Sequence, residues 1–379
     1  MSQPTRPLIE VLAEIEDARQ ARGKRHPLVA ILALVCVATL CGYRSYGAMA
    51  AWGRNYGAGC MEALGFTRPT PPSAATLYRA LRGLDRVAFE AAIGAWAEEV
   101  LTAVAVAPGA GPTAVAVDGK ALRGSRKQGA AGSHLLAAVS QGLGLPLGQQ
   151  AVDEKTNEIP VFHELLRDLV VEGRVYTMDA LLTQRAAARA IVDGGGDYVM
   201  VTKDNQPRLH DDAEVLLASP PHVGPPLTTA GTVDLGHGRI ERRRVTARAV
   251  LPGDCDWPGA RQVFMIERHT THKKSGRERH EVTYGMTSRS PERMSAPELL
   301  RLLRGHWHIE NGVHWVRDVT FDEDRSQVRT GSIPAILATV RTTAIGLFRH
   351  AREPNIAAAC RHCAAQPAVA LALIGILRE

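Results

Sequence analysis

The sequence predicts an α/β protein in which a mixed sheet follows an all-helical N-terminal region. Apolar residues repeat at helical spacing through roughly the first hundred positions. From residue 113 onward, short apolar runs typical of strands take over and alternate with helical segments. Three early strands followed by helix–strand alternation indicate a mixed sheet with helices on its faces.

The N-terminal region, residues 8 to about 104, shows the helical pattern from Leu8 onward. Pro27 can open the next helix, and Ser73 can cap a later one. The apolar run over residues 28–42 is shorter than the roughly 20 residues of a membrane span. We therefore expect a buried core helix and no membrane. A compact helical module with basic loops fits DNA binding, and a plain helical scaffold fits this region equally well.

Strand-like and helix-like segments then alternate along the chain. Strands are predicted at 113–118, 134–140, 147–152, 174–179 and 197–202, with helices at 161–169 and 183–192. Two basic, β-rich segments, 239–250 and 261–287, interrupt this order and predict a β insertion. Ser295 and Glu298 match a capping box for a long helix that continues to Glu310, and further helices are predicted at 333–348 and 357–377. We expect four parts, at residues 1–104, 113–219, 220–290 and 291–379.

Charge and cysteine usage restrict the partners and the compartment. The chain has 45 Lys and Arg against 39 Asp and Glu, a net charge of +6, and a pI near 9.1. Residues 235–280 alone hold eleven basic against five acidic residues, again +6, which suits a polyanion partner. The first residues lack the apolar core of a signal peptide, and the six cysteines show no disulfide framework, so we expect reduced thiols in the cytoplasm. Cys360 and Cys363 form one close pair, but a structural zinc site normally needs four ligands.

Two aspartates, Asp118 and Asp179, each end a predicted strand. In a sheet with α/β connections that edge binds ligands, and neighbouring strands lie under about 5 Å apart. Two such carboxylates suit Mg²⁺, and two ions about 4 Å apart can stabilise both oxygens of a phosphodiester displacement. Glu310 is the candidate third carboxylate. Each acid alone has an ordinary alternative, as a turn former, a helix cap or a surface residue.

Six blocks of local sequence strengthen this interpretation: Val117–Ser125, Glu154–Ile159, Thr177–Gln184, Asp197–Gln206, His237–Arg243 and Arg304–Asp324. In this order, over nearly the whole chain, they resemble insertion-sequence transposases of the ISAs type, which include the H-repeat-associated group of the DDE superfamily. One block alone is weak, whereas six in order are specific. Thr156 stands where the family usually has Ser. Related families have Lys where this chain has Arg317, and Arg where it has His306.

The resemblance implies a ribonuclease-H-like catalytic core with a β-rich insertion before the last acid. It implies a DNA transposase that cleaves insertion-sequence ends and transfers the 3′ ends to target DNA. The catalytic and metal-binding residues would be Asp118, Asp179 and Glu310, with Asp318 as the alternative third acid. Two Mg²⁺ ions, with Mn²⁺ as a substitute, would be the cofactor. Double-stranded DNA, as transposon ends and as target, would be the partner of a dimer or higher oligomer.

Cations, amides and aromatic side chains near the proposed acids are candidates for DNA contact. They are Lys120, Arg123, Lys203, Asn205, Gln206, Arg304, His306, Trp307, Asn311, His314 and Arg317. The insertion adds Arg239, Arg242, Arg243 and Arg244, of which β alternation puts Arg242 and Arg244 on one side and Arg243 on the other. A solvated loop is the alternative for the cations, and a core position is the alternative for Trp307 and Trp315.

Two other functions compete with the transposase. One is a DNA-binding relative that has lost catalysis, and the other is a structure-specific nuclease on the same fold. The first would bind DNA without nicking it in Mg²⁺, and the second would cut DNA without ever joining it.

Overall fold

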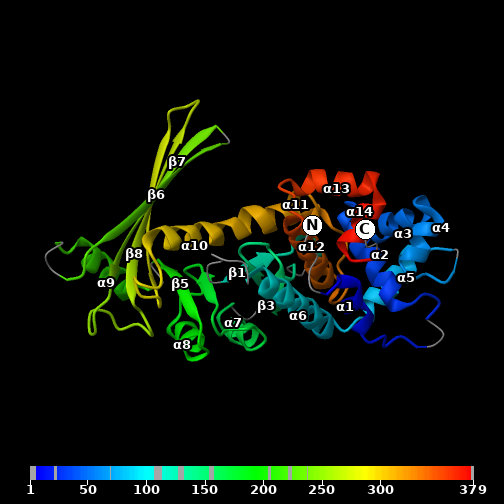
Figure 1. Ribbon diagram of the computed structural model, residues 1–379, viewed down its shortest axis with the longest axis horizontal. Helices are drawn as coiled ribbons and strands as arrows, with labels where there is room; N and C mark the ends of the chain where they lie inside the picture. The colour runs from blue at the N-terminus through cyan, green and yellow to red at the C-terminus, as the bar shows by residue number, and fades with distance from the viewer. Residues whose placement is uncertain are drawn as a thin grey trace. The chain divides into compact units, whose positions relative to one another are not determined.

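The computed structural model describes residues 6–20, 24–68, 70–105, 113–126, 132–152, 158–203, 206–220, 224–236 and 238–376. The chain divides into two compact units (Figure 1). Unit 1 comprises Met1–Gly111, Gly119–Asn157 and Ile309–Glu379, and unit 2 comprises Pro112–Asp118 and Glu158–His308.

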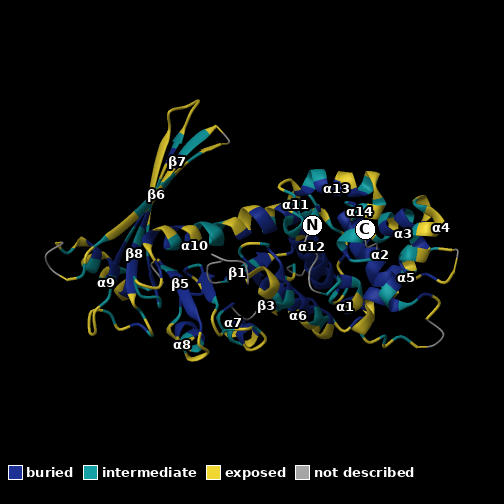
Figure 2. Cartoon of the chain, in the orientation of Figure 1, coloured by how far each residue is buried: buried dark blue, intermediate teal, exposed yellow. Residues whose placement is uncertain are grey.

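The N-terminal part of unit 1 is helical, as predicted. Its elements are α1 (Leu8–Glu14), α2 (Leu28–Leu40), α3 (Tyr46–Asn55), α4 (Gly57–Ala63), α5 (Ala74–Arg82) and α6 (Arg86–Ala105). The predicted buried core helix is α2, which follows Pro27 and has 12 of its 13 residues buried, dark blue in Figure 2. Ser73 caps α5 by accepting a hydrogen bond from the Thr76 backbone N–H at 3.2 Å, as the sequence predicts.

The rest of unit 1 contains the antiparallel hairpin of β2 (His134–Ser140) and β3 (Pro146–Val152), together with C-terminal helices. These are α11 (Trp315–Val319), α12 (Ile333–His350), α13 (Ile356–Ala365) and α14 (Pro367–Leu373). In α13, Cys360 and Cys363 are buried, and burial raises the pKa of each thiol to about 12. Among the described residues no single helix is long and apolar enough to cross a membrane, although α13 and α14, bent by 117°, pass such a test as a pair.

Unit 2 is built on a mixed sheet. Its strands are β4 (Val175–Met178), β5 (Asp197–Thr202), β6 (Thr228–Gly236), β7 (Arg239–Ala249), β8 (Gln262–His272) and β9 (Glu278–Thr287). The strand before them in the chain is β1 (Ala114–Ala121), which begins in unit 2 and ends in unit 1. Within the sheet these strands lie in the order β1-β4-β5-β9-β8-β7-β6. Strands β1, β4 and β5 are parallel, whereas β9, β8, β7 and β6 are antiparallel.

The predicted β insertion extends this sheet because β9 pairs with β5, from Val199 opposite Thr287 to Thr202 opposite Tyr284. Three helices of unit 2 are α7 (Glu158–Arg167), α8 (Arg185–Asp193) and α9 (Pro207–Ala218). The sequence analysis did not predict α9, whose buried residues Leu209, Ala213 and Leu217 repeat every four positions. The large mixed sheet and the helical N-terminal region confirm the α/β class. The ribonuclease-H-like assignment and the four domain boundaries stay predictions.

The long helix before the third acid is α10 (Ala296–His308). Its buried face, with Leu299 and Leu303, packs on sheet residues that include Val245 and Phe264. The prediction that this helix runs on regularly to Glu310 is wrong, because Ile309–His314 forms a π-helical turn. The wider turn changes the helical register, so Glu310 is exposed and does not continue the buried face.

Candidate functional site

The first two predicted acids lie at the same level on neighbouring segments of unit 2. Parallel pairing of β1 with β4 ends at Val117 opposite Met178, and Asp118 and Asp179 are the next residues along the chain. Asp179 follows the end of β4 as predicted, but the prediction that Asp118 ends its strand is wrong, because β1 continues to Ala121. The two side chains therefore lie on one face of neighbouring strands, and both residues are partly exposed. One oxygen of Asp179 accepts a hydrogen bond from the Leu182 backbone N–H at 3.1 Å, so this side chain also caps a turn.

A histidine of α10 lies beside the second acid. His306 Nδ1 is 3.1 Å from Thr177 Oγ1 on β4. Burial lowers the pKa of His306 to about 4, although the Asp179 carboxylate opposes the shift. The imidazole is therefore neutral near pH 7 and brings no positive charge to the aspartate. His306 was predicted as a DNA contact, and the structure shows it packed beside the strand end.

The predicted third acid and its alternative both belong to unit 1. Glu310 is an exposed residue of the π-helical turn. The alternative, Asp318 of α11, has one oxygen 2.6 Å from Lys120 Nζ, and its other oxygen is buried without a hydrogen-bond partner among the described residues. Burial raises the pKa of Asp318, although Lys120 opposes the shift. The ammonium already neutralises Asp318.

The first of the six sequence blocks packs, within unit 1, against the segment that follows α11. Lys120 is 8% exposed and is held by Asp318, whereas Arg123 is 70% exposed and lies 3.8 Å from Asp324. Gly124 approaches this segment so closely that an added Cβ would lie 2.5 Å from the Glu323 backbone oxygen. Gly124 and Lys120 therefore have a packing role within unit 1.

Arg317 belongs to a buried cluster of charged side chains. Its guanidinium, 2% exposed, donates to Glu323 at 2.7 Å, and Arg341 donates to the other carboxylate oxygen at 2.8 Å. The two arginines lower the pKa of Glu323 to about 2, against the effect of burial. DNA contact by Arg317 stays a prediction, but its side chain has a structural partner in the core of unit 1.

The arginines of β7 divide between two faces, as β alternation predicts. Arg242 and Arg244 are exposed on the face that we call the open face. On the other face, which α10 covers, Arg243 contacts Asp234 and Glu241 and lies 5.8 Å from the Trp307 ring centre. Arg239 and Arg268 also pair with Glu241, and Arg304 of α10 pairs with Asp234. The sequence did not predict that Asp234 and Glu241 bind the arginines of this face.

The other predicted DNA contacts have varied surroundings. Lys203 is exposed, and Gln206 Nε2 donates to the Thr183 carbonyl and to the Gln184 side-chain oxygen. Trp307 is partly buried against the unit 2 core, whereas Trp315 is 55% exposed. Asn311 is exposed and His314 is partly buried. Asn205 and His237 lie outside the described residues, as do the first four residues of the block Glu154–Ile159.

Two protein-family models match this chain. A family model described as "Transposase DDE domain" matches residues 109–345, and one described as "DDE_Tnp_1-associated" matches residues 9–97. Because the first match covers more than half of the chain, this chain belongs to the transposase DDE domain family.

Relatives in bacteria match most of the chain. The Escherichia coli O157:H7 protein named "Putative transposase YncI" is 29% identical, over 91% of this chain and 88% of that protein. The Escherichia coli K12 protein named "H repeat-associated putative transposase YhhI" is 26% identical over 90% of each chain. A cryo-EM structure of a piggyBac transposase synaptic complex with hairpin DNA covers 98% of this chain and 80% of its own, at 10% identity and a TM-score of 0.42. At that score the likeness carries no argument.

Proposed function

We propose that this protein is a DNA transposase that cleaves insertion-sequence ends and joins the 3′ ends to target DNA. One observation carries the proposal: Asp118 and Asp179 stand level on adjacent parallel strands, directly after the last paired residues of β1 and β4. Both belong to sequence blocks that resemble a transposase family, and the chain belongs to the transposase DDE domain family. We further propose that β1 to β5 form a ribonuclease-H-like core.

The donor set beside the last paired residues of β1 and β4 fits a divalent metal ion. It offers carboxylate oxygens, which Mg²⁺ prefers, and the neutral His306 beside Asp179 does not compete as a cation. We propose that Asp118, Asp179 and Glu310 hold two Mg²⁺ ions, with Mn²⁺ as a substitute. When bound, these ions would supply activation of the attacking oxygen and charge stabilisation of the leaving oxygen. Members of DDE transposase families generally use divalent metal ions.

The protein's own groups would position the metal-binding carboxylates. The Leu182 N–H fixes one Asp179 oxygen, which leaves the other for an ion. His306 contacts β4, and Glu310 follows His306 by four residues within a π-helical turn, a feature frequent at functional sites. These two observations support Glu310 as the third acid over Asp318, which Lys120 already neutralises.

DNA binding would use exposed cationic and aromatic side chains. Arg242 and Arg244 on the open face would contact phosphates, and the exposed Trp315 would stack on a base near the cleavage point. Joining two DNA ends requires two active sites, so we propose that a dimer or higher oligomer assembles on DNA.

The test is a cleavage and joining assay on a duplex that carries the element's own end sequence. The wild-type protein should nick the end and join the 3′ end to a target duplex only when Mg²⁺ or Mn²⁺ is present. Asp118→Asn, Asp179→Asn and Glu310→Gln should each lose at least about 1,000-fold in rate, the equivalent of about 4 kcal/mol, while still binding DNA. Asp211→Asn, an exposed aspartate of α9, is the matched control and should cut normally.

Three results would change the assignment. Cutting without joining would favour the structure-specific nuclease. Binding without nicking by the wild-type protein would favour a relative that has lost catalysis. Normal cutting by any of the three acid variants would remove that residue from the site.

A further inference from the structure

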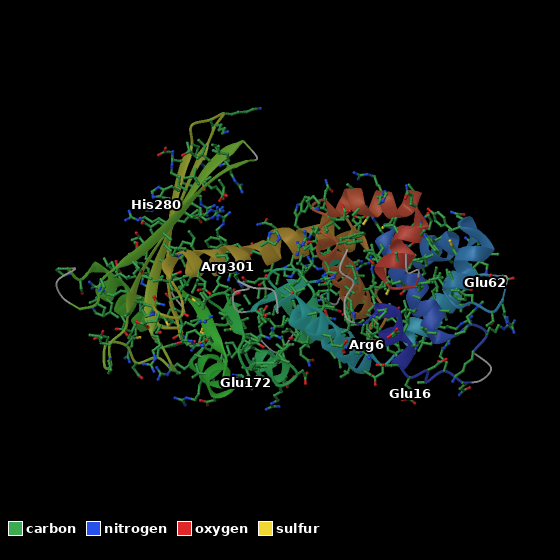
Figure 3. The ribbon with its side chains drawn as sticks, viewed as in Figure 1. Arg6, Glu16, Glu62, Glu172, His280 and Arg301 are labelled. Atoms are coloured by element: carbon green, nitrogen blue, oxygen red, sulfur yellow. The ribbon has the colours of Figure 1, made fainter. Side chains whose placement is uncertain are left out.

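A second group of metal-ligand side chains lies on the long ribbon of β8 and β9 in unit 2. Glu267 and His269 are two residues apart on β8, so they share a face, and His280 of β9 pairs directly with His269. Figure 3 labels His280 on this ribbon. These three residues belong to none of the blocks that carry the family resemblance, and the proposed reaction does not use them.

The three side chains converge. The rings of His269 and His280 are stacked, with centres 3.9 Å apart and planes inclined by 15°. His280 Nε2 is 3.6 Å from Glu267 Oε1, and one ligand atom from each residue lies within 4.8 Å of the others. Ligands of a tetrahedral zinc ion lie about 3.4 Å apart, as zinc–ligand distances near 2.1 Å require. Rotations of the partly exposed Glu267 and the exposed His269 and His280 side chains would bring the ligand atoms to this separation.

We propose that Glu267, His269 and His280 form a binding site for a zinc-class transition-metal ion, distinct from the proposed magnesium site. Two imidazoles and one carboxylate are ligands that zinc accepts, whereas Mg²⁺ prefers oxygen ligands alone. Both histidines are exposed, so the fourth position would be open to solvent. Glu278, on the same face of β9 two residues before His280, adds a further carboxylate nearby.

The site would add a side-chain cross-link to the backbone pairing of β8 with β9. The tip of the ribbon, from residue 272 to residue 280, is exposed throughout, as the yellow ends of these strands in Figure 2 show. A metal ion that joins β8 to β9 would restrict fraying there. The ion would also add positive charge to the open face. In the register of β7 and β8, Glu267 stands opposite Arg244 and His269 stands opposite Arg242, so these side chains share that face.

Zinc binding to the untagged full chain tests the proposal, and it requires neither DNA nor catalysis. Calorimetric titration in excess Mg²⁺, which keeps oxygen-only sites filled, should show one equivalent of tightly bound Zn²⁺. His269→Ala and His280→Ala should each weaken that equivalent at least about 100-fold, since even outer-shell changes cost 10–100-fold. His272→Ala, an exposed histidine on the opposite face of the same strand, should stay within about twofold of wild type.

Two further measurements separate this site from other ligands. The Co²⁺-loaded protein should show no sulfur-to-metal charge-transfer band, because no cysteine is among the three ligands. Zn²⁺ should raise the Tm of the wild type and of His272→Ala above that in EDTA, but not the Tm of the other two variants. If either alanine variant is less stable than wild type in EDTA, the glutamine variant at the same position, His269→Gln or His280→Gln, is used in its place.

The proposal is overturned if the wild type binds no such equivalent of zinc. It is also overturned if His272→Ala weakens binding as much as His280→Ala, or if a sulfur band appears. Because the strand-end acids take no part in this site, Asp179→Asn should bind Zn²⁺ normally. Failure of the zinc proposal would leave the transposase proposal standing, and the reverse also holds.

Discussion

Two acidic regions of the molecule use their carboxylates in opposite ways. In the acidic segment of unit 1, residues 318–324, every carboxylate has a cation partner: Lys120 for Asp318, Arg44 and Arg325 for Asp322, Arg317 and Arg341 for Glu323, and Arg123 for Asp324. At the strand ends of unit 2, Asp179 accepts from a backbone amide and lies beside a neutral histidine.

This difference indicates which acids are structural. A carboxylate matched by protein cations gains nothing further from a metal ion, because its charge is already compensated. A carboxylate beside neutral groups keeps its attraction for a divalent cation. Proximity of acids in the sequence is therefore a poor guide, since the densest acidic segment of this chain is the one whose charges are satisfied.

The largest test of this contrast compares Glu310→Gln with Asp318→Asn. Glu310→Gln should lower the cleavage rate at least about 1,000-fold, because it removes a proposed metal ligand. Asp318→Asn should change the rate less than about tenfold, since its carboxylate serves Lys120. Single-turnover cleavage at saturating Mg²⁺, normalised to folded protein, measures both. The opposite ranking would make Asp318 the third acid and end the contrast.

The next test concerns stability alone. Glu323→Gln should lower the free energy of unfolding by about 3–5 kcal/mol, because it leaves Arg317 and Arg341 buried without a counterion. Urea denaturation followed by circular dichroism measures the loss. Asp324→Asn is the control and should cost less than about 1 kcal/mol, since its partner Arg123 is largely exposed. A loss below about 1 kcal/mol for Glu323→Gln would contradict the assigned role.

The same cluster predicts a pH dependence. The pKa of Glu323 is lowered to about 2 in the folded protein, against about 4.3 in an unfolded chain. A lowered acid pKa means that the stabilisation is present above about pH 4.3 and is lost as the pH falls toward 2. The stability difference between wild type and Glu323→Gln should therefore shrink over that window. A constant difference would contradict it.

These contrasts mark what sequence alone could predict. The strands at 134–140 and 197–202 were predicted to the residue, because turn residues bound compact apolar runs. Asp118 and Asp179 each follow an apolar run that the sequence shows, but the pairing of their two strands is a finding of the structure. The pairing of Lys120 with Asp318 could not be predicted from the sequence either, because the partners are 198 positions apart. The π-helical turn at Glu310 and the burial of Arg317 likewise depend on packing that no local pattern encodes.

The arginines of β7 show the same contrast between side chains that have protein partners and side chains that are exposed. Here we expect a smaller effect, on the salt dependence of DNA binding. Replacing Arg242 and Arg244 with Ala should reduce the slope of log affinity against log salt by about 1.8, because each phosphate that is no longer neutralised lowers it by about 0.9. Arg243→Met should leave the slope unchanged, because its guanidinium is held by Asp234 and Glu241. Fluorescence anisotropy on a DNA duplex at several salt concentrations measures both. Equal slopes for the double variant and wild type would remove the open face from the DNA surface.

The smallest expected effect decides between two roles for Lys120, which the sequence predicts as a DNA contact and the structure buries against Asp318. In a cycle of Lys120→Met, Asp318→Asn and the double variant, a structural ion pair should give a coupling energy of about 1–2 kcal/mol. The pair Arg123 and Asp324 is the matched control and should give less than about 0.5 kcal/mol, since Arg123 is largely exposed. Chemical denaturation measures these energies, and the salt dependence of DNA binding by Lys120→Met measures the other role. A slope reduced by about 0.9 with no coupling would return Lys120 to the DNA surface and leave Asp318 without its neutralising partner.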